Sequence, residues 1–271
     1  MISKFSKHER NKDFRLKFVL IFGGTDLNHD QFDNEREQII TEIVKKAAHR
    51  ICFTENFFEM ACSKWPELKF ILQPQAVCLT SDHIVEKVDR LNIVLVTGIR
   101  PVKDVLFALE CWKKFKMKFK DSKRSFLIVG PTIDQNYAEK VFKELECMKE
   151  YDVSYQSFIP QEALFKIISQ SFATLNSSKS EGQSAAILES MSLGIPVIAR
   201  NIPGNRFIKS GETGLLFDDP EDFSNNLRKL ENGVLWETLS KQAKTYIKNE
   251  HSEKIENETY CQLADDLRNN N

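Results

Sequence analysis

The sequence predicts an α/β protein in which helices cover both faces of parallel sheets, as in doubly wound, Rossmann-like folds. Short apolar segments rich in strand-forming residues alternate along the 271-residue chain with longer segments whose apolar residues recur at helical spacing. Glycine and proline stand at many of the junctions between these segments. Hydrophobic residues make up 41% of the chain, which is enough to form a buried core.

The first part of the chain is expected to alternate as β-α-β-α-β. Strands are predicted at 17–22, 51–54 and 69–77, and helices at 35–50 and 55–64. These strands are fewer than the roughly five or six of a complete Rossmann sheet. We therefore expect residues 1–85 to form an incomplete Rossmann-like domain that lacks a preceding βαβ segment. A small cap domain with a three-stranded sheet is the alternative.

The second part, residues 86–250, is predicted to be a complete Rossmann-like domain, because strand and helix segments alternate throughout it. The strands are expected at 92–96, 125–129, 153–158, 172–175, 195–199 and 214–217, and the helices at 104–114, 137–149, 161–170, 184–193, 221–230 and 234–248. Residues 251–271 are expected to form a polar C-terminal helix or tail.

The charge balance and the lack of long apolar segments exclude several classes of protein. A net charge of −1 argues against a protein that binds nucleic acid through a wide basic face. The basic segment 113–124 is interpreted as a solvated helix end, with nucleic acid or anionic lipid binding as the alternative. No apolar run approaches the roughly 20 residues of a transmembrane helix, and the N-terminus lacks the apolar stretch of a signal peptide. We predict a cytoplasmic protein, secreted only if a preceding segment carries a signal.

Cysteine and histidine show no metal-ligand spacing. The six cysteines are scattered without a CxxC pair, and the five histidines are equally dispersed. The chain also lacks an Asp-x-Asp sequence that would bridge a metal ion to a diphosphate. We therefore predict reduced thiols, no cofactor and no bound metal.

The most informative stretch is 176–205, where a strand runs into a turn and a helix opens near Ser184. A strand-turn-helix junction presents unbonded backbone amides and the positive end of a helix dipole. The small residues Gly182, Ser184, Ala185 and Ala186 allow an anion to approach this backbone closely. The stretch therefore predicts a seat for a pyrophosphate group.

Two glutamates flank this junction. Glu181 lies just before the helix and Glu189 lies within it. A carboxylate accepts hydrogen bonds from neighbouring sugar hydroxyls, so one of them is predicted to contact a hexose and the other a ribose. The alternative is an ordinary helix start with an acidic cap and an exposed glutamate.

The same stretch resembles the donor-site signature of the retaining glycosyltransferases of group 1. The similarity rests on Glu181, on Glu189 eight residues later, and on the sequence GIPVIA at 194–199. The segment 97–104 (TGIRPVKD) resembles the family's Arg…Lys element, with a shorter gap between the two cations, and 211–217 resembles its TGLL segment. Ser190 stands where the family usually has alanine, and Asn205 ends an NIPGN turn where many members have Gly-Gly-x-x-Glu.

The resemblance implies a GT-B fold with two Rossmann-like domains, in which the N-terminal domain takes an acceptor and the C-terminal one a nucleotide-sugar. It implies hexose transfer with retention of configuration, by front-face attack and without a metal. Arg100 and Lys103 would then stabilise the leaving diphosphate, with solvated surface cations as the alternative. Glu181 would orient the hexose and Glu189 would anchor the ribose. Asn205 would join Gly182, Ser184, Ala185 and Ala186 in binding the donor.

Three questions stay open from the sequence. The turn at 23–28 (GGTDLN) resembles a GTD-x-N turn of some family members, which makes Asp26 a candidate sugar contact; a plain structural turn is the alternative. The chain is either an active transferase or an inactive nucleotide-sugar binder with an incomplete N-terminal domain, and an epimerase is a third reading. The nucleotide, the sugar, the acceptor and the oligomeric state are not predicted.

Overall fold

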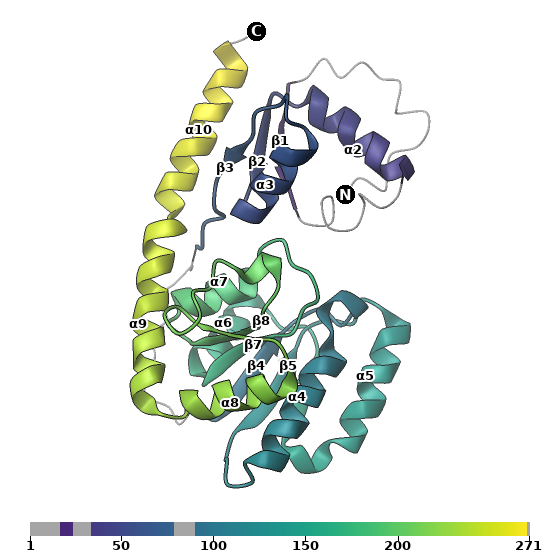
Figure 1. The fold of residues 1–271 in the computed structure, drawn as a ribbon, viewed down its shortest axis with the longest axis vertical. Helices are drawn as coiled ribbons and strands as arrows, with labels where there is room; N and C mark the ends of the chain where they lie inside the picture. Colours follow the sequence, from purple (N-terminus) through teal and green to yellow (C-terminus); the bar gives the residue numbers. More distant parts are fainter. Residues whose placement is uncertain (1–16, 24–33, 79–89, 270–271) are drawn as a thin grey trace. The chain divides into compact units, whose positions relative to one another are not determined.

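The computed structural model describes residues 17–23, 34–78 and 90–269, and contacts between residues divide the chain into two compact units (Figure 1). The smaller unit lies within 1–73 and 257–271, and the larger unit within 74–256. The sequence-based boundaries after 85 and after 250 fall near these divisions and stay predictions. No described helix combines the length and the apolar character needed to cross a membrane.

The smaller unit has a parallel sheet with the strand order β1-β2-β3 among the residues described. Its elements follow the predicted alternation: β1 (Val19–Phe22), α2 (Asn34–Lys46), β2 (His49–Cys52), α3 (Glu55–Lys64) and β3 (Ile71–Leu72). Its core contains Phe22, Val44, Phe57 and Trp65. The strand predicted at 69–77 is represented in the structure only by the two residues of β3.

Arg50 lies in β2, although it was predicted to end the preceding helix. Its Nε donates to the carbonyl of Val44 at 2.5 Å and its Nη2 to the carbonyl of Ala47 at 2.6 Å. These carbonyls lie at the C-terminal end of α2, where the helix leaves its acceptors unbonded. The helix therefore ends at Lys46, and Arg50 satisfies its end from the neighbouring strand.

Helix α10 (Glu253–Asn269) forms from the polar C-terminal stretch and contributes to the smaller unit from residue 257 onward. Leu263 is buried, and the hydroxyl of Thr259 donates to Oε1 of Gln73 at 2.7 Å. This stretch is accordingly a regular helix rather than a loose tail.

The larger unit is built on a parallel six-stranded sheet with the order β6-β5-β4-β7-β8-β9. Its strands are β4 (Asn92–Val96), β5 (Ser125–Val129), β6 (Val153–Gln156), β7 (Ala173–Asn176), β8 (Val197–Arg200) and β9 (Leu215–Phe217). Its helices are α4 (Val105–Lys118), α5 (Gln135–Cys147), α6 (Gln161–Gln170), α7 (Ala185–Ser192), α8 (Pro220–Leu230) and α9 (Gly233–Glu250), with 3-10 turns η3 (Pro101–Lys103), η4 (Lys149–Tyr151) and η5 (Pro203–Asn205).

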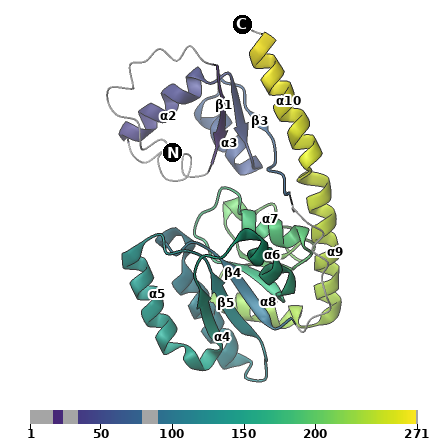
Figure 2. The same cartoon turned by 180° about the vertical axis from the view of Figure 1, so that it is seen from behind.

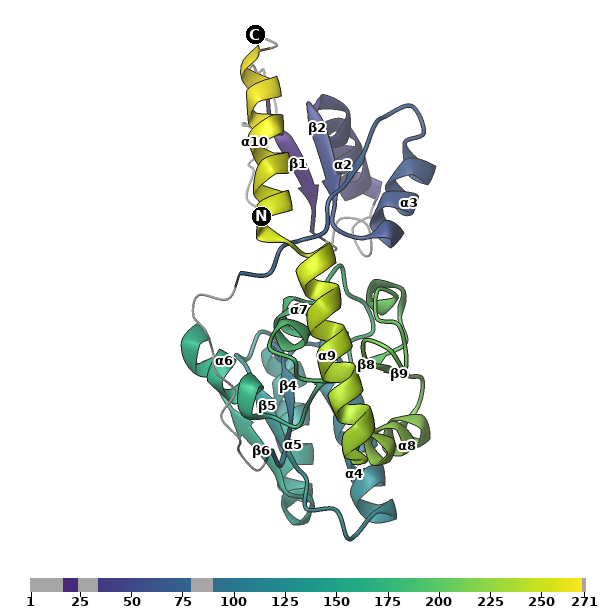
Figure 3. The same cartoon turned by 90° about the vertical axis from the view of Figure 1, so that its left-hand side faces the viewer.

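Helices cover both faces of this sheet, as the sequence predicted. Alternate residues of a strand point to opposite faces, so Ile93 and Leu95 of β4 pack with α4, α5 and α8, whereas Val94 packs with α6. Figure 2 shows β4 and β5 beside α4 and α5. On the other face α9 packs against α7 (Figure 3).

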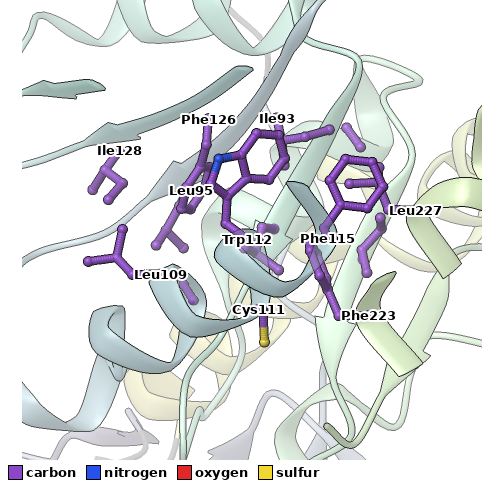
Figure 4. Close-up of a cluster of buried hydrophobic side chains, with 14 of the residues drawn as sticks. Ile93, Leu95, Leu109, Cys111, Trp112, Phe115, Phe126, Ile128, Phe223 and Leu227 are labelled. Atoms are coloured by element: carbon purple, nitrogen blue, oxygen red, sulfur yellow. The ribbon is translucent and has the colours of Figure 1, made fainter. Parts of the chain in front are cut away.

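Trp112 of α4 is the largest fully buried side chain of the main core, shown in Figure 4. Its ring lies 5.4 Å from those of Phe115 and Phe126. Its Nε1 donates to the carbonyl of Tyr151 at 2.7 Å, so its only polar atom is satisfied. This core fixes α4 against the sheet and therefore also fixes the turn η3 that precedes it.

Candidate functional site

The strand order of the larger unit reverses between β4 and β7. From β4 the chain proceeds outward through β5 and β6, and then returns to place β7 on the other side of β4. In open α/β sheets a crevice forms at the carboxyl ends of the strands at such a switch point. The residues that follow β4 and β7 are therefore the candidates for a ligand site.

Lys103 and Glu181 meet at this switch point. Lys103 ends η3 after β4, and Glu181 lies in the loop after β7. The Nζ of Lys103 lies 2.6 Å from Oε1 of Glu181, and the side chains are 18% and 8% exposed. Two oppositely charged groups 78 positions apart in the sequence are thus held in contact and largely shielded from solvent.

Glu181 receives two further hydrogen bonds on the same oxygen. The hydroxyl of Ser178 donates at 2.6 Å, and Nδ2 of Asn176, the last residue of β7, donates at 3.2 Å. Three donors on one carboxylate oxygen fix the rotamer of Glu181. The carboxylate is therefore a pre-oriented acceptor at the mouth of the sheet.

The loop after β7 is tied to the turn after β4. The hydroxyl of Ser177 donates to the carbonyl of Lys103 at 2.8 Å, and the amide of Lys179 donates to the carbonyl of Val102 at 2.9 Å. Asp104 then accepts from Nη1 of Arg200, the last residue of β8, at 2.9 Å. Three neighbouring strand ends are cross-linked by these contacts, which explains how the Lys103–Glu181 pair is positioned.

Asn205 is fully buried beneath this network. Its Nδ2 donates to Oδ1 of Asn176 at 3.1 Å and to the carbonyl of Arg200 at 2.9 Å. Its Oδ1 is buried and has no hydrogen-bond partner among the residues described. The preceding Gly204 lies against Glu181, because a Cβ at this position would stand 2.3 Å from the carbonyl oxygen of Glu181.

The N-terminus of α7 lies just beyond Glu181. Ser184 occupies the N-cap position without a capping hydrogen bond from its side chain. Within the part of the chain that the structure describes, the amides of Ala185 and Ala186 have no acceptor. Gly182 precedes them, so small residues line this approach, and the amides are available to an anion.

Glu189 lies one turn into α7 and carries a carboxylate with no hydrogen bond or ion pair to any described residue. Partial burial raises the pKa of this carboxyl above its ordinary value. A half-buried acceptor without a protein partner is a group suited to a ligand's hydroxyl groups.

Ser190, which replaces the family's alanine, has a structural explanation. Its hydroxyl is fully buried, lies 2.7 Å from the hydroxyl of Thr174 and donates to the carbonyl of Ala186 at 2.6 Å. The pair joins α7 to β7 directly behind the candidate site. An alanine at this position would leave the buried hydroxyl of Thr174 without its hydrogen-bond partner.

One predicted residue among those described is not part of this network. Arg100 is exposed at the start of η3 and makes no ion pair with any described residue, so the structure does not bring its guanidinium to Glu181. Asp26 lies outside the described residues. In contrast, Asn176, Ser178 and Arg200 were not singled out from the sequence. The sequence feature that could have identified them is a polar residue at the end of a buried strand or just after it.

Three lysines of the basic segment 113–124 are paired with carboxylates within the larger unit. Lys114 pairs with Glu221 at 3.1 Å, Lys118 pairs with the same carboxylate, and Lys116 pairs with Asp152 at 2.9 Å. Among the described residues, no three His, Cys, Asp or Glu side chains gather as a metal site.

Comparisons with known proteins identify the family of the chain. The family described as "Glycosyl transferases group 1" matches residues 81–250. A protein of Xenopus tropicalis named Glycosyltransferase 1 domain-containing protein 1 is 36% identical over 274 residues, which cover 94% of this chain and 78% of that protein.

Solved structures share the fold at low identity. A TarM mutant of S. aureus, in complex with Fondaparinux, alpha-GlcNAc-glycerol and UDP, matches with a TM-score of 0.76 at 18% identity, over 94% of this chain and 52% of that one. Alr3699/HepE of Anabaena, in complex with UDP and glucose, matches with a TM-score of 0.77 at 14% identity, over 92% and 71%. This chain thus spans about half the length of TarM. These matches confirm the predicted GT-B fold over the span covered.

Proposed function

Because this chain belongs to the group 1 glycosyltransferase family, we propose that it transfers a hexose from a nucleoside diphosphate sugar to an acceptor with retention of configuration. The observation that carries the proposal is the contact between Lys103 and Glu181 at the switch point of the sheet. It places a cation and a fixed acceptor beside the unbonded amides at the start of α7. This combination of groups suits a sugar diphosphate.

The donor's diphosphate lies at the N-terminus of α7 in this proposal. The amides of Ala185 and Ala186 donate to phosphate oxygens, and the helix dipole favours the negative charge. Lys103 adds a full positive charge at the bond to be broken. Arg100, exposed at the same edge of the sheet, reaches the diphosphate when the donor is bound. As the bond between sugar and phosphate breaks, charge accumulates on the leaving group, and these groups stabilise it.

Glu181 orients the hexose rather than attacking it. Its Oε1 accepts from Lys103, Ser178 and Asn176, and this arrangement lowers the electron density available for nucleophilic attack. A fixed carboxylate is instead well placed to accept hydrogen bonds from sugar hydroxyls. This favours front-face attack by the acceptor, in which the leaving phosphate oxygen takes the acceptor's proton.

Glu189 accepts the ribose hydroxyls of the nucleotide. It has no hydrogen-bond or ion-pair partner among the described residues, and ribose would supply two neighbouring donors to its half-buried carboxylate. Uridine diphosphate is the first nucleotide to test, because both structural relatives above were solved with UDP. The proposal involves no metal ion.

A second candidate function is nucleotide-sugar binding without transfer. The sheet of the smaller unit has three described strands, whereas the larger unit has six. If the smaller unit is the acceptor-binding half, its small sheet favours nucleotide-sugar binding without turnover.

The test combines calorimetry with a product assay. The chain is titrated with UDP, and the release of UDP from UDP-glucose and UDP-N-acetylglucosamine is measured with and without candidate acceptor sugars. If the chain is a transferase, it should bind UDP and release UDP from a donor sugar. Both the affinity for UDP and the rate of release should fall by about ten-fold or more in Lys103→Ala and Glu181→Ala. Lys166→Ala, an exposed lysine of α6, is the matched control.

Each outcome separates the two functions. Binding without release in any acceptor mixture supports the binder. Neither binding nor release, with the fold intact by circular dichroism, contradicts both. Release unchanged in Lys103→Ala and Glu181→Ala contradicts the site assignment.

A further inference from the structure

An open cavity lies at the opposite end of the same sheet from the Lys103–Glu181 pair. It has a volume of about 570 Å³ and is formed at the amino ends of three strands, where Leu91, Arg124 and Phe172 immediately precede β4, β5 and β7. The start of α9 closes it through Trp236. All of its lining residues belong to the larger unit.

This cavity has an excess of positive charge. Four cations line it (Arg90, Lys123, Arg124 and Arg228), against the carboxylates of Asp121 and Glu231. Asp121 accepts from Arg228 at 3.0 Å, and Glu231 accepts from Arg228 at 2.7 Å and from Arg124 at 3.3 Å. Both carboxylates are therefore already engaged. Arg90 and Lys123 have no carboxylate partner among the described residues.

Arg90 is held in a position that leaves part of its guanidinium unsatisfied. Its Cζ lies 4.6 Å from the ring centre of Trp236, and its Nε is buried without a hydrogen-bond partner in the described chain. Desolvation lowers the pKa of Arg90, although an arginine remains protonated at neutral pH. A buried charged donor without an acceptor costs free energy, and a bound anion would offset that cost.

Arg124 is fixed in the same manner on the other side of the cavity. Its Cζ lies 3.4 Å from the ring centre of Phe172. Contact with the aromatic rings restricts both side chains, and Arg124 already donates through Nε to Glu231 and through Nη1 to the carbonyl of Arg90, so little side-chain freedom is lost when an anion binds. The rings themselves are covered, which disfavours a ligand that depends on stacking against them.

The cavity is distinct from the donor site. The Lys103–Glu181 pair lies beyond the carboxyl ends of β4 and β7, whereas Leu91 and Phe172 lie before their amino ends. A five-residue strand separates the two ends by about 16 Å. A ligand here would not contact the donor's reacting atoms.

We propose that this cavity binds a small phosphate monoester, such as a sugar phosphate. The excess of two positive charges matches a phosphate dianion, and the planar guanidinium of Arg90, which has no carboxylate partner among the described residues, offers donors to its oxygens. The volume lies within the roughly 300–1,000 Å³ of small-molecule sites. Lys123, exposed at the rim, adds the remaining unpaired cation. The proposal does not rest on the transferase reaction.

The experiment titrates the whole chain with glucose 6-phosphate, inorganic phosphate and glucose by calorimetry. We expect glucose 6-phosphate to bind, inorganic phosphate to bind more weakly and glucose not to bind. Lys123→Ala and Arg90→Ala should each weaken glucose 6-phosphate binding about ten-fold or more. Lys120→Ala, an exposed lysine on the same loop that does not line the cavity, should leave affinity within about two-fold. Lys103→Ala should leave it unchanged.

Four results would overturn this assignment. One is that glucose 6-phosphate does not bind. Another is that inorganic phosphate binds as tightly as glucose 6-phosphate, because the ester then plays no part in recognition. The third is loss of binding in Lys103→Ala, which assigns the anion to the donor site. Because Arg90→Ala also removes packing against Trp236, Lys123→Ala is decisive. An unchanged affinity in Lys123→Ala refutes the proposal even if Arg90→Ala weakens binding.

Discussion

Substitution of Gly204 by alanine tests whether the η5 turn positions Glu181. The added Cβ would stand 2.3 Å from the carbonyl oxygen of Glu181 and 2.9 Å from its carbonyl carbon. Both are backbone atoms, so no side-chain rotation relieves the contact. The oxygen and the Cβ must separate by about 1 Å to reach the 3.4 Å of an ordinary contact.

The expected effect is larger on function than on stability. Overpacking at a buried position costs about 1–3 kcal/mol, which a domain of ordinary stability survives. A displacement of about 1 Å in a group that orients the reacting sugar costs on the order of a hundred-fold in rate. We therefore expect Gly204→Ala to fold, to unfold at a lower urea concentration, and to lose about 99% of donor turnover.

The assay measures UDP release from the best donor together with urea unfolding followed by tryptophan fluorescence. Gly233→Ala is the control, because a Cβ there meets nothing within 4 Å. It should keep wild-type turnover and be as stable or slightly more stable, since alanine favours the helix that begins at this residue. Wild-type turnover in Gly204→Ala, or an equal loss in Gly233→Ala, would refute the reasoning.

Three further substitutions test the surroundings of the site and the larger unit. Ser190→Ala leaves the buried hydroxyl of Thr174 without its partner and should cost about 1–3 kcal/mol in urea unfolding, part of which Thr174→Val restores. Burial raises the pKa of Glu189, so its ionisation destabilises the fold as pH rises through that raised pKa. Glu189→Gln should therefore increase the melting temperature at pH 7, and it should weaken UDP binding in calorimetry. Burial lowers the pKa of His251, so stability should fall as pH drops below about 6.5, and His251→Gln should flatten this part of a melting-temperature profile.

Each of these expectations can fail on its own. A Ser190→Ala variant as stable as the parent would show that water satisfies Thr174. A lower melting temperature for Glu189→Gln at pH 7 would mean that the carboxylate stabilises the fold. If the melting temperature of His251→Gln still falls as the pH drops below about 6.5, the proton uptake belongs to another group.

The order and type of the elements in the larger unit were determined by the sequence. Helical spacing around Trp112 and the apolar run at Ser125–Val129 are local patterns, and local patterns decide which element a segment forms. The small residues before α7, the two glutamates and the family resemblance were legible for the same reason, because they lie within one continuous stretch.

The ends of elements were less predictable where a distant side chain decides them. Arg50 was assigned to a helix because its neighbours have helical spacing, but its guanidinium bonds the carbonyls that the helix leaves open. The expected strand at 69–77 is reduced to Ile71–Leu72, because pairing with β2 extends no further.

Only the tertiary structure decided which residues share a site. Lys103 and Glu181 are 78 positions apart, and they meet because β7 returns to the side of β4. Ser190 is paired because Thr174 lies opposite, and Arg90 borders a cavity because Trp236 closes over it. Periodicity along a chain records which face of an element is buried, but the order of strands in a sheet sets which strand ends meet, and that order follows from packing over the whole unit.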